Sequence, residues 1–231
     1  IRSATKPHPG PVVIEVCLDA QGSQVDVDFL DKSYPSGALD NPNTEVETNA
    51  TLKKLKNAKR PLLLLGGLLT RKCVAEHYEA LLRLNVPCAT TTSAIDRVPN
   101  KSALYVGRTG TWGGQRAANL IIAQADLVIS IGAQLDLQQT GFNYKKFCPM
   151  AELIQVFPSL VELEREGPEA KIKLNCDPDI FLKRLLLHAE WKDESKWIDY
   201  KDEIIKKMPP LEIENLIESE FINPFVFLQN L

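Results

Sequence analysis

The sequence lacks the residue clusters from which metal sites and disulfide frameworks are built. Its five cysteines are scattered and never form Cys-x-x-Cys, and its three histidines stand far apart without a His-Glu-x-x-His motif. This pattern predicts neither a zinc site nor disulfides, and free cysteines are typical of a reducing compartment. We therefore expect a cytoplasmic protein in which no side-chain cluster binds a metal.

Charge of one sign and long apolar runs are also missing. The 231 residues include 27 Lys and Arg against 30 Asp and Glu, interspersed along the chain, for a formal net charge of -3. This balance leaves no basic face for nucleic acid and no polybasic anchor. No apolar run approaches the ~20 residues that span a bilayer. We therefore predict no nucleic-acid partner and no membrane partner.

Strand patterns alternate with helix patterns over most of the chain. Apolar strand patterns occupy residues 11–18, 62–65, 86–91, 126–131, 150–156 and 172–174. Helical periodicity occupies residues 44–57, 70–84, 115–124 and 178–187, the last with Asp177 as its predicted N-cap. This alternation predicts an α/β fold, an open and mostly parallel Rossmann-like sheet with helices on both faces.

Composition suggests where the chain divides. Residues 19–48 are rich in Asp, Ser, Pro, Gly and Asn, and so long a linker inside one compact domain is unusual. Beyond Trp191 a charged amphipathic stretch ends at Pro209–Pro210, which predicts a surface helix leading out of the domain. Because the chain ends inside an unfinished helical pattern, we expect it to be a piece of a longer protein.

The stretch 105–142 concentrates the glycines. Four glycines, the first of them Gly107, precede the predicted helix 115–124, and the strand after that helix ends at Gly132. Glycines allow close backbone approach and helix N-termini attract anions, so a phosphate cradle is one interpretation. The spacing is not G-x-G-x-x-G and no clear strand precedes Gly107, so the dinucleotide motif is not met.

Several polar and aromatic residues near these glycines allow two interpretations each. Arg108 suits a phosphate contact or the capping of a carbonyl group, and Trp112 suits stacking on a ligand or packing of its own loop. Asp136 and the threonines 90–92 follow strands, where open α/β sheets bind ligands, yet both residue types are also common in turns and at strand ends. The sequence alone does not decide between these interpretations.

Five runs in a fixed order resemble a known family. They are AKRPLLLLGG (58–67), NVPCATTTSAIDRVP (85–99), YVGRTGTWGGQRAANLIIAQADLVISIGAQLDLQQTG (105–141), AELIQV (151–156) and KLNCDPDIFLKRL (173–185). Together they resemble the central domain of thiamine-diphosphate-dependent enzymes of the acetolactate synthase and pyruvate oxidase group. GPVVIEVCLDAQG (10–22) resembles the last strand of the preceding pyrimidine-binding domain, and INPFVFLQNL (222–231) resembles the opening of the following pyrophosphate-binding domain.

The resemblance implies a division of the chain into five parts. These are a tail of the pyrimidine-binding domain (1–22), a linker (23–43), the central Rossmann-like domain (44–190), a charged helix and linker (191–220) and the start of the pyrophosphate-binding domain (221–231). The implied partners are the two other domains, in a parent enzyme that is a homodimer or homotetramer.

The resemblance also implies the chemistry of the parent enzyme, a carboligase or decarboxylase that acts on a 2-keto acid with thiamine diphosphate and Mg²⁺. In the family, a glutamate of the first domain activates the cofactor, and a G-D-G motif with a downstream asparagine in the third domain binds its diphosphate through Mg²⁺. The present sequence contains no G-D-G. This piece is therefore predicted to be non-catalytic and not to bind thiamine diphosphate. The alternative is a free-standing nucleotide-binding or regulatory module of the same fold.

Some relatives hold FAD or ADP in the central domain, and the matching positions are candidates for cofactor binding. They are Gly66, Gly67, Gly107, Arg108, Thr109, Gly110, Gly132, Gln134 and Asp136. Acetolactate synthases usually have arginines where Gln134 and Gln138 stand, and a D-I-D-like segment where this chain has residues 157–159. Charge-assisted hydrogen bonds are worth roughly 1.5 to 3 kcal/mol each, so these changes argue against FAD.

Overall fold

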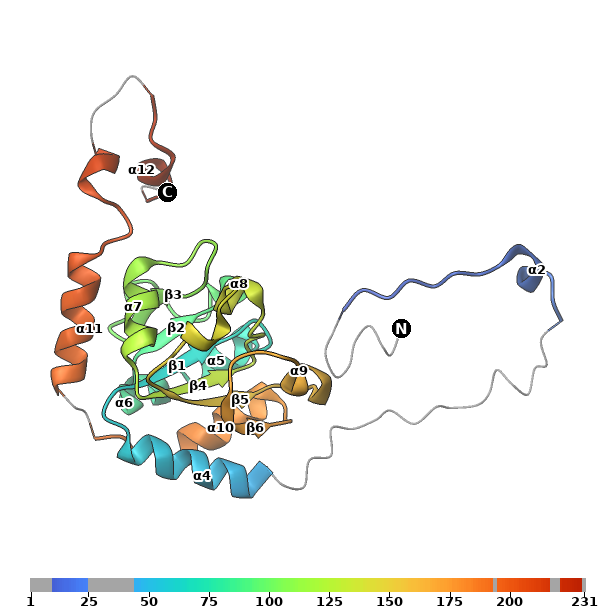
Figure 1. Cartoon of the computed structure of the whole chain (residues 1–231), viewed down its shortest axis with the longest axis horizontal. Coiled ribbons are helices and arrows are strands. Elements are labelled where there is room, and N and C mark those ends of the chain that lie inside the picture. Colours follow the sequence, from blue (N-terminus) through green and yellow to red (C-terminus); the bar gives the residue numbers. More distant parts are fainter. Residues whose placement is uncertain (1–9, 25–43, 193–194, 217–220, 230–231) are drawn as a thin grey trace. The chain divides into compact units, whose positions relative to one another are not determined.

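The computed structural model describes residues 10–24, 44–192, 195–216 and 221–229. Contacts divide the chain into two units, Ile1–Asn41 and Pro42–Leu231, and the second contains the sheet (Figure 1). In the first unit, the expected strand 11–18 is not formed: residues 11–17 have no strand partner among the described residues, and the short helix α2 (Leu18–Gln21) follows. A strand needs a neighbour to satisfy its backbone groups, and apolar content alone does not supply one.

Six parallel strands form a single sheet in the second unit. They are β1 (Pro61–Leu65), β2 (Cys88–Thr90), β3 (Tyr105–Arg108), β4 (Leu127–Ile131), β5 (Glu152–Val156) and β6 (Ala170–Leu174). Their order is β3-β2-β1-β4-β5-β6, so the chain winds outward from β1 on one side and then from β4 on the other. This is the doubly wound arrangement, and it confirms the predicted α/β fold class.

The strands sort their side chains onto two faces. In β1, Leu63 and Leu65 join one apolar cluster, whereas Leu62 and Leu64 join the other. This follows from the two-residue period of a strand, and a sheet covered on both faces needs continuous apolar strands such as PLLLL. The core therefore consists of two layers, one on each side of the sheet.

Helices cover both layers. The first layer packs under α4 (Thr44–Asn57), α5 (Arg71–Glu76), α6 (Tyr78–Leu84) and α10 (Pro178–His188), and the second under α7 (Arg116–Gln124) and α11 (Ser195–Lys207). In Figure 1, α4 and α10 lie together at the bottom and α7 lies beside α11 at the left. The remaining helices are short: η1 (Thr92–Ala94), α8 (Leu137–Thr140), η2 (Tyr144–Lys146), α9 (Leu160–Glu164), η3 (Ile213–Leu216) and α12 (Pro224–Gln229).

Two local predictions are wrong and two are confirmed. Strand β3 lies where the sequence shows no clear strand, and the predicted helix 70–84 is split at His77, whose φ of -112° is not helical. Helix α4 has the predicted bounds. Asp177 caps α10 as predicted, because its carboxylate accepts hydrogen bonds from the backbone N–H groups of Asp179 and Ile180 at 2.9 and 3.1 Å.

Helix α11 is part of the packed second face. The side chain of Trp197 lies in the second apolar layer and is only 2% exposed, and its indole N–H donates to the carbonyl oxygen of Pro61 at 3.0 Å. The buried ammonium of Lys201 donates to the carbonyl oxygen of Ala103 at 2.6 Å. The expectation that this helix only leads out of the domain is therefore wrong, because it covers the sheet.

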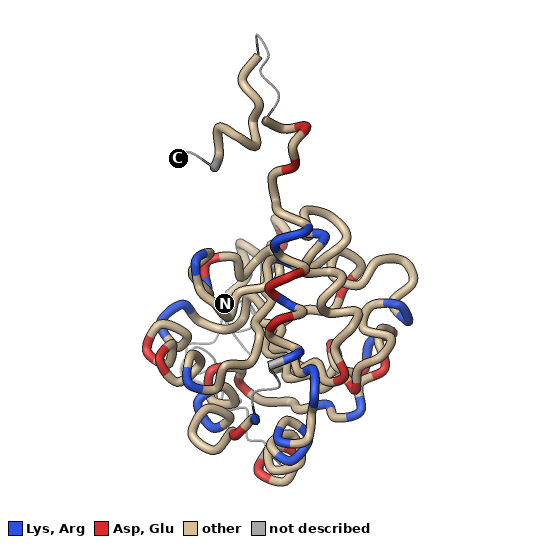
Figure 2. The backbone as a smooth tube through the Cα atoms, turned by 90° about the vertical axis from the view of Figure 1, so that its left-hand side faces the viewer, with Lys and Arg blue, Asp and Glu red and all other residues tan. Residues whose placement is uncertain are grey.

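Charge and hydropathy of the described residues agree with the composition. Figure 2 shows basic and acidic residues interspersed along the chain, as the formal net charge of -3 suggests. None of the helices in the described ranges combines the length and apolar character that crossing a bilayer requires.

Candidate functional site

A cavity of about 350 Å³ lies at the carboxyl ends of the strands. Residues that follow β2 and β4 line it: Thr91, Thr92, Ser93, Gln134, Asp136, Gln138 and Gln139. The strand order reverses between β1 and β4, and open α/β sheets bind their ligands at this edge, beside the reversal. We call this cavity the carboxyl-edge crevice.

The lining of the carboxyl-edge crevice is polar and, among the described residues, includes no cation. Its side chains are hydroxyls, amides and the single carboxylate of Asp136. That carboxylate caps α8, accepting hydrogen bonds from the N–H groups of Gln138 and Gln139 at 3.0 and 3.1 Å. Gln134 donates to a carboxylate oxygen of Glu162 at 3.3 Å. This lining suits a neutral polar group and lacks the lysine or arginine that usually pairs with a phosphate.

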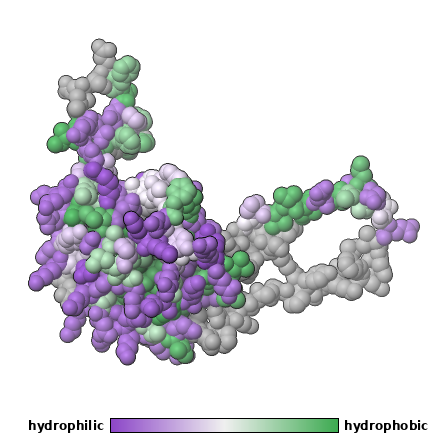
Figure 3. All heavy atoms as spheres, in the orientation of Figure 1, coloured by the Kyte–Doolittle hydropathy of each residue, from purple (hydrophilic) through white to green (hydrophobic). Residues whose placement is uncertain are grey.

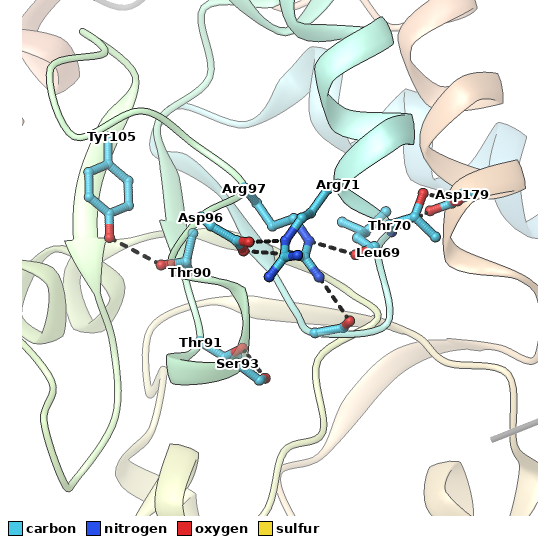
Figure 4. Close-up of polar contacts among 11 residues, drawn as sticks. Leu69, Thr70, Arg71, Thr90, Thr91, Ser93, Asp96, Arg97, Tyr105 and Asp179 are labelled. Atoms are coloured by element: carbon cyan, nitrogen blue, oxygen red, sulfur yellow. Dashed lines mark hydrogen bonds and ion pairs between the residues drawn. The ribbon is translucent and has the colours of Figure 1, made fainter. Parts of the chain in front are cut away.

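A half-buried arginine near the crevice is held by the protein itself (Figure 4). Arg97 donates through Nε to the carbonyl oxygen of Leu69 at 2.7 Å and through Nη2 to that of Gly67 at 3.2 Å. It also pairs with Asp96, which pairs in turn with Arg71. The guanidinium of Arg97 thus bridges two carbonyl groups of the loop after β1 and holds that loop in place.

The pKa of Asp96 reflects these two arginines. Partial desolvation would raise it, but the hydrogen bond from Arg71 and the charges of both arginines outweigh that effect, so the pKa lies below its ordinary value. Asp96 therefore stays ionised at neutral pH. Both guanidinium groups share Asp96 as their carboxylate partner, and this single carboxylate balances one of the two positive charges.

The first glycine of the loop after β1 is required by close packing. The N–H of Gly66 donates to the carbonyl oxygen of Ile131 at 2.9 Å, which continues the β1–β4 pairing. A Cβ atom at Gly66 would lie 2.1 Å from the Cα atom of Ala133. The absence of a side chain at Gly66 thus lets two backbones meet and leaves no room for a phosphate.

The glycine loop after β3 is closed by side-chain amides. Asn119 accepts from the N–H of Gly110 and donates to its carbonyl oxygen, both at 3.0 Å. The N–H of Arg108 donates to Oε1 of Gln115 at 2.9 Å, and that of Thr111 to the carbonyl oxygen of Gln138 at 2.7 Å. An anion cradle needs unpaired N–H groups, and these three already have partners.

The two other polar candidates of this loop also have internal partners. Arg108 donates through Nε to the carbonyl oxygen of Gly113 at 2.6 Å, which is the capping alternative. The hydroxyl of Thr109 is buried and accepts from Nε2 of Gln139 at 2.6 Å. Trp112, in contrast, is 54% exposed.

The structure therefore brings together only part of the predicted set. Gln134 and Asp136 line the carboxyl-edge crevice, and Thr91 and Thr92 join them there. The other candidates do not line it: Gly66, Gly67, Gly107, Arg108, Thr109, Gly110 and Gly132.

Sequence reasoning missed a second cavity, of about 390 Å³, at the opposite edge of the sheet. Its lining residues are Lys59, Arg60, Gln124, Met150, Lys196, Trp197 and Tyr200. They come from the segments before β1 and β5, the end of α7 and the first turns of α11. Only the run KWIDY (196–200) hints at it, with a lysine beside two aromatic residues one helical turn apart. We call it the amino-edge pocket.

The parallel sheet order, the helices on both faces and the crevice at the strand reversal define a Rossmann-like α/β domain. Residues 48–185 match the family described as thiamine pyrophosphate enzyme, central domain. The chain belongs to this family, and the resemblance to thiamine-diphosphate-dependent enzymes of the acetolactate synthase group is confirmed.

Curated relatives are acetolactate synthase large subunits. The chain is 27% identical over 208 residues to the isozyme 1 large subunit of Escherichia coli, covering 90% of this chain and 36% of that protein. It is 28% identical over 223 residues to a probable large subunit of Methanocaldococcus jannaschii, with the same coverage. The Haemophilus influenzae large subunit is 26% identical over 171 residues, covering 72% and 30%. The chain thus spans about a third of the length of these relatives.

The residues present do not fit the cofactors that the family suggests. The sequence contains no G-D-G, and within the described ranges no three His, Cys, Asp or Glu side chains gather as metal ligands do. For a flavin dinucleotide, the carboxyl-edge crevice offers no cation to its pyrophosphate, and the glycine loop donates its N–H groups internally. No reaction step is therefore assigned to this chain.

Proposed function

We propose that this chain is the central structural domain of a thiamine-diphosphate-dependent enzyme that acts on a 2-keto acid, by carboligation of the acetolactate synthase type in preference to simple decarboxylation. The match of residues 48–185 to the family carries this proposal. The parent enzyme would be cytoplasmic. Thiamine diphosphate and Mg²⁺ would supply the carbanion chemistry from sites on its other domains.

The chain by itself would be a scaffold without catalytic activity. The loops at the carboxyl edge are closed by internal contacts, such as the Asn119–Gly110 pair and the Arg97 guanidinium, which hold the edge in one shape. A rigid edge without a charged or nucleophilic cluster suits the positioning of neighbouring domains better than chemistry. We also propose that the crevice holds no flavin.

Calorimetry on the 231-residue chain tests the non-catalytic assignment. Thiamine diphosphate with Mg²⁺ is expected to give no saturable heat, because the G-D-G motif is missing from the sequence. Saturable binding would overturn the assignment of this chain as a central domain.

A second experiment addresses the parent enzyme. The full-length gene product should convert pyruvate to acetolactate when thiamine diphosphate and Mg²⁺ are added, and its visible absorption spectrum should show no flavin. A full-length product that lacks a G-D-G motif downstream of Leu231 and does not consume 2-keto acids would refute the enzyme assignment.

The carboxyl-edge crevice favours one alternative, a free-standing nucleotide-binding or regulatory module. The crevice lies where open α/β sheets bind ligands, and its hydroxyl and amide groups can hydrogen-bond a ribose. A module of this kind would be encoded without the flanking domains and would bind a nucleoside. The length of the reading frame separates the two functions.

Exposed apolar side chains support the proposal that neighbouring domains cover parts of this chain. Figure 3 shows hydrophobic residues along residues 10–18 and at α12, and Val13 and Phe225 are 92% and 60% exposed. Large exposed apolar patches usually mark surfaces that contact another protein or domain. We propose that the pyrimidine-binding and pyrophosphate-binding domains cover them, in a homodimer or homotetramer.

A further inference from the structure

The amino-edge pocket combines positive charge with aromatic surface. Lys59, Lys196 and Arg60 line it, and none of the lining residues that the structure describes is acidic. Within the described part of the chain, none of these three cations has a carboxylate at ion-pair distance. These three cations line one cavity.

An acidic residue beside this cluster binds backbone groups. The carboxylate of Asp126 accepts hydrogen bonds from the backbone N–H groups of Lys59 and Arg60, each at 2.9 Å. It therefore caps the turn before β1 and does not line the pocket. Lys59, Arg60 and Lys196 thus line the cavity together, without a side-chain ion pair to Asp126.

The wall of the amino-edge pocket is fixed in place. Nε of Arg60 donates to the carbonyl oxygen of Gln124 at 2.7 Å, which holds the guanidinium against the end of α7. The rings of Trp197 and Tyr200 stack with centroids 5.7 Å apart and an interplanar angle of 12°. Because the indole of Trp197 is anchored by its bond to Pro61, Tyr200 presents a half-buried ring at a defined position.

We propose that the amino-edge pocket binds a nucleoside phosphate. The cavity of about 390 Å³ has a size typical of small-molecule sites. Tyr200 and Met150 supply the apolar surface on which a planar base packs, and the two lysines with Arg60 pair with the phosphate. This site lies at the opposite edge of the sheet from the carboxyl-edge crevice and is independent of the function proposed above.

Calorimetric titration of the 231-residue chain with AMP tests the site. AMP should bind saturably, and adenosine and inorganic phosphate should each bind about tenfold more weakly or less, because each supplies only half of the recognised chemistry. The double variant Lys59→Gln, Lys196→Gln should weaken AMP binding at least about tenfold. The matched control is Lys206→Gln, an exposed lysine of α11 outside the pocket, which should leave the affinity unchanged.

A second pair of measurements separates this site from the crevice. Gln134→Ala, at the opposite edge, should not change AMP binding, and added salt should weaken binding to the unmodified chain. The proposal is overturned if AMP gives no saturable heat up to about 1 mM. It is also overturned if the double lysine variant binds AMP as tightly as the Lys206→Gln control, or if Gln134→Ala abolishes binding.

Discussion

The two edges of the sheet differ in what their polar groups contact. At the carboxyl edge, where the fold places its ligands, backbone and side-chain donors are paired within the protein: Asn119 with Gly110, and Arg97 with two carbonyl oxygens. At the amino edge, Lys59 and Lys196 face a cavity without a carboxylate partner among the described residues. The carboxyl edge therefore pairs its donors within the protein, whereas the amino edge presents lysines without a carboxylate partner among the described residues.

This difference shows that glycines in a loop are ambiguous evidence. A glycine is needed wherever a backbone approaches something closely, and at Gly66 the neighbour is the protein's own chain at Ala133. Uncompensated cations in a cavity are more specific evidence, because a protein gains little from placing like charges together unless a ligand or partner covers them.

The largest expected effect tests the amino edge, where α11 covers the sheet. Trp197→Ala should lower the free energy of unfolding by about 3–5 kcal/mol, because it removes a fully buried ring and leaves the carbonyl oxygen of Pro61 without its indole donor. Urea unfolding measures the change. Trp112→Ala is the matched control, and at 54% exposure it should cost less than about 1 kcal/mol. Equal effects would show that α11 does not pack on the sheet in solution.

The next effect tests the carboxyl edge. Gly66→Ala should destabilise the chain by about 3 kcal/mol, since the new methyl group would lie 2.1 Å from Cα of Ala133 and the backbones of β1 and β4 would have to separate. Gly167→Ala is the control within the same unit, because its nearest contact would be 3.9 Å away. A small effect at Gly66 in urea unfolding would mean that the loop after β1 can open, and with it the crevice.

Much of the fold could be predicted because its signals are local. Helix α4 has the predicted bounds, and Asp177–Pro178 marks the start of α10 through the cap and the proline at the first turn. The sequence predicts Asp136 to follow a strand, because the apolar run of β4 is easy to recognise. Strand β3 was missed because Gly107 lies inside it and its outer residues are half-buried at the sheet edge, so it has no apolar run.

The amino-edge pocket could not be predicted for a different reason. Lys59 and Tyr200 lie far apart in the sequence and line one cavity only because α11 packs across the second face of the sheet. The charged composition of 191–207 is typical of a solvated helix, and the single buried face carrying Trp197 is a weak signal within it. Likewise the strand pattern 11–18 carries no information on whether a partner strand is present.

A smaller effect measures how firmly the carboxyl edge is closed. Asn119→Ala should cost about 1–2 kcal/mol, because it removes both hydrogen bonds to Gly110 and leaves that N–H unpaired. Amide hydrogen exchange at Gly110 should become faster than in the unmodified chain. Asn143→Ala is the control, since that side chain makes no capping hydrogen bond. If Gly110 exchanges equally fast before and after Asn119→Ala, the glycine loop is open in solution and the contrast between the two edges fails.

The smallest expected effect is on the pH dependence of stability. It should be equal at the two edges, because each edge has one buried cysteine of similar pKa. Cys88 opens β2 at the amino edge and Cys176 follows β6 at the carboxyl edge, and burial raises the pKa of each thiol to about 12 from an ordinary value of 9.0. In this case the folded state keeps its protons while the unfolded thiols ionise, so stability falls as the pH rises through 9 toward 12.

Between pH 7 and pH 9 each thiol should account for a loss of about 0.4 kcal/mol in the free energy of unfolding. Urea unfolding at the two pH values should show that Cys88→Ala and Cys176→Ala each reduce the total pH-dependent loss by about 0.4 kcal/mol. Iodoacetamide at pH 8 should label only the exposed Cys17 of the native chain, because the other four thiols are buried. Rapid labelling of Cys176 but not Cys88 would show that the carboxyl edge opens more readily than the amino edge, which contradicts the firm internal pairing at the carboxyl edge.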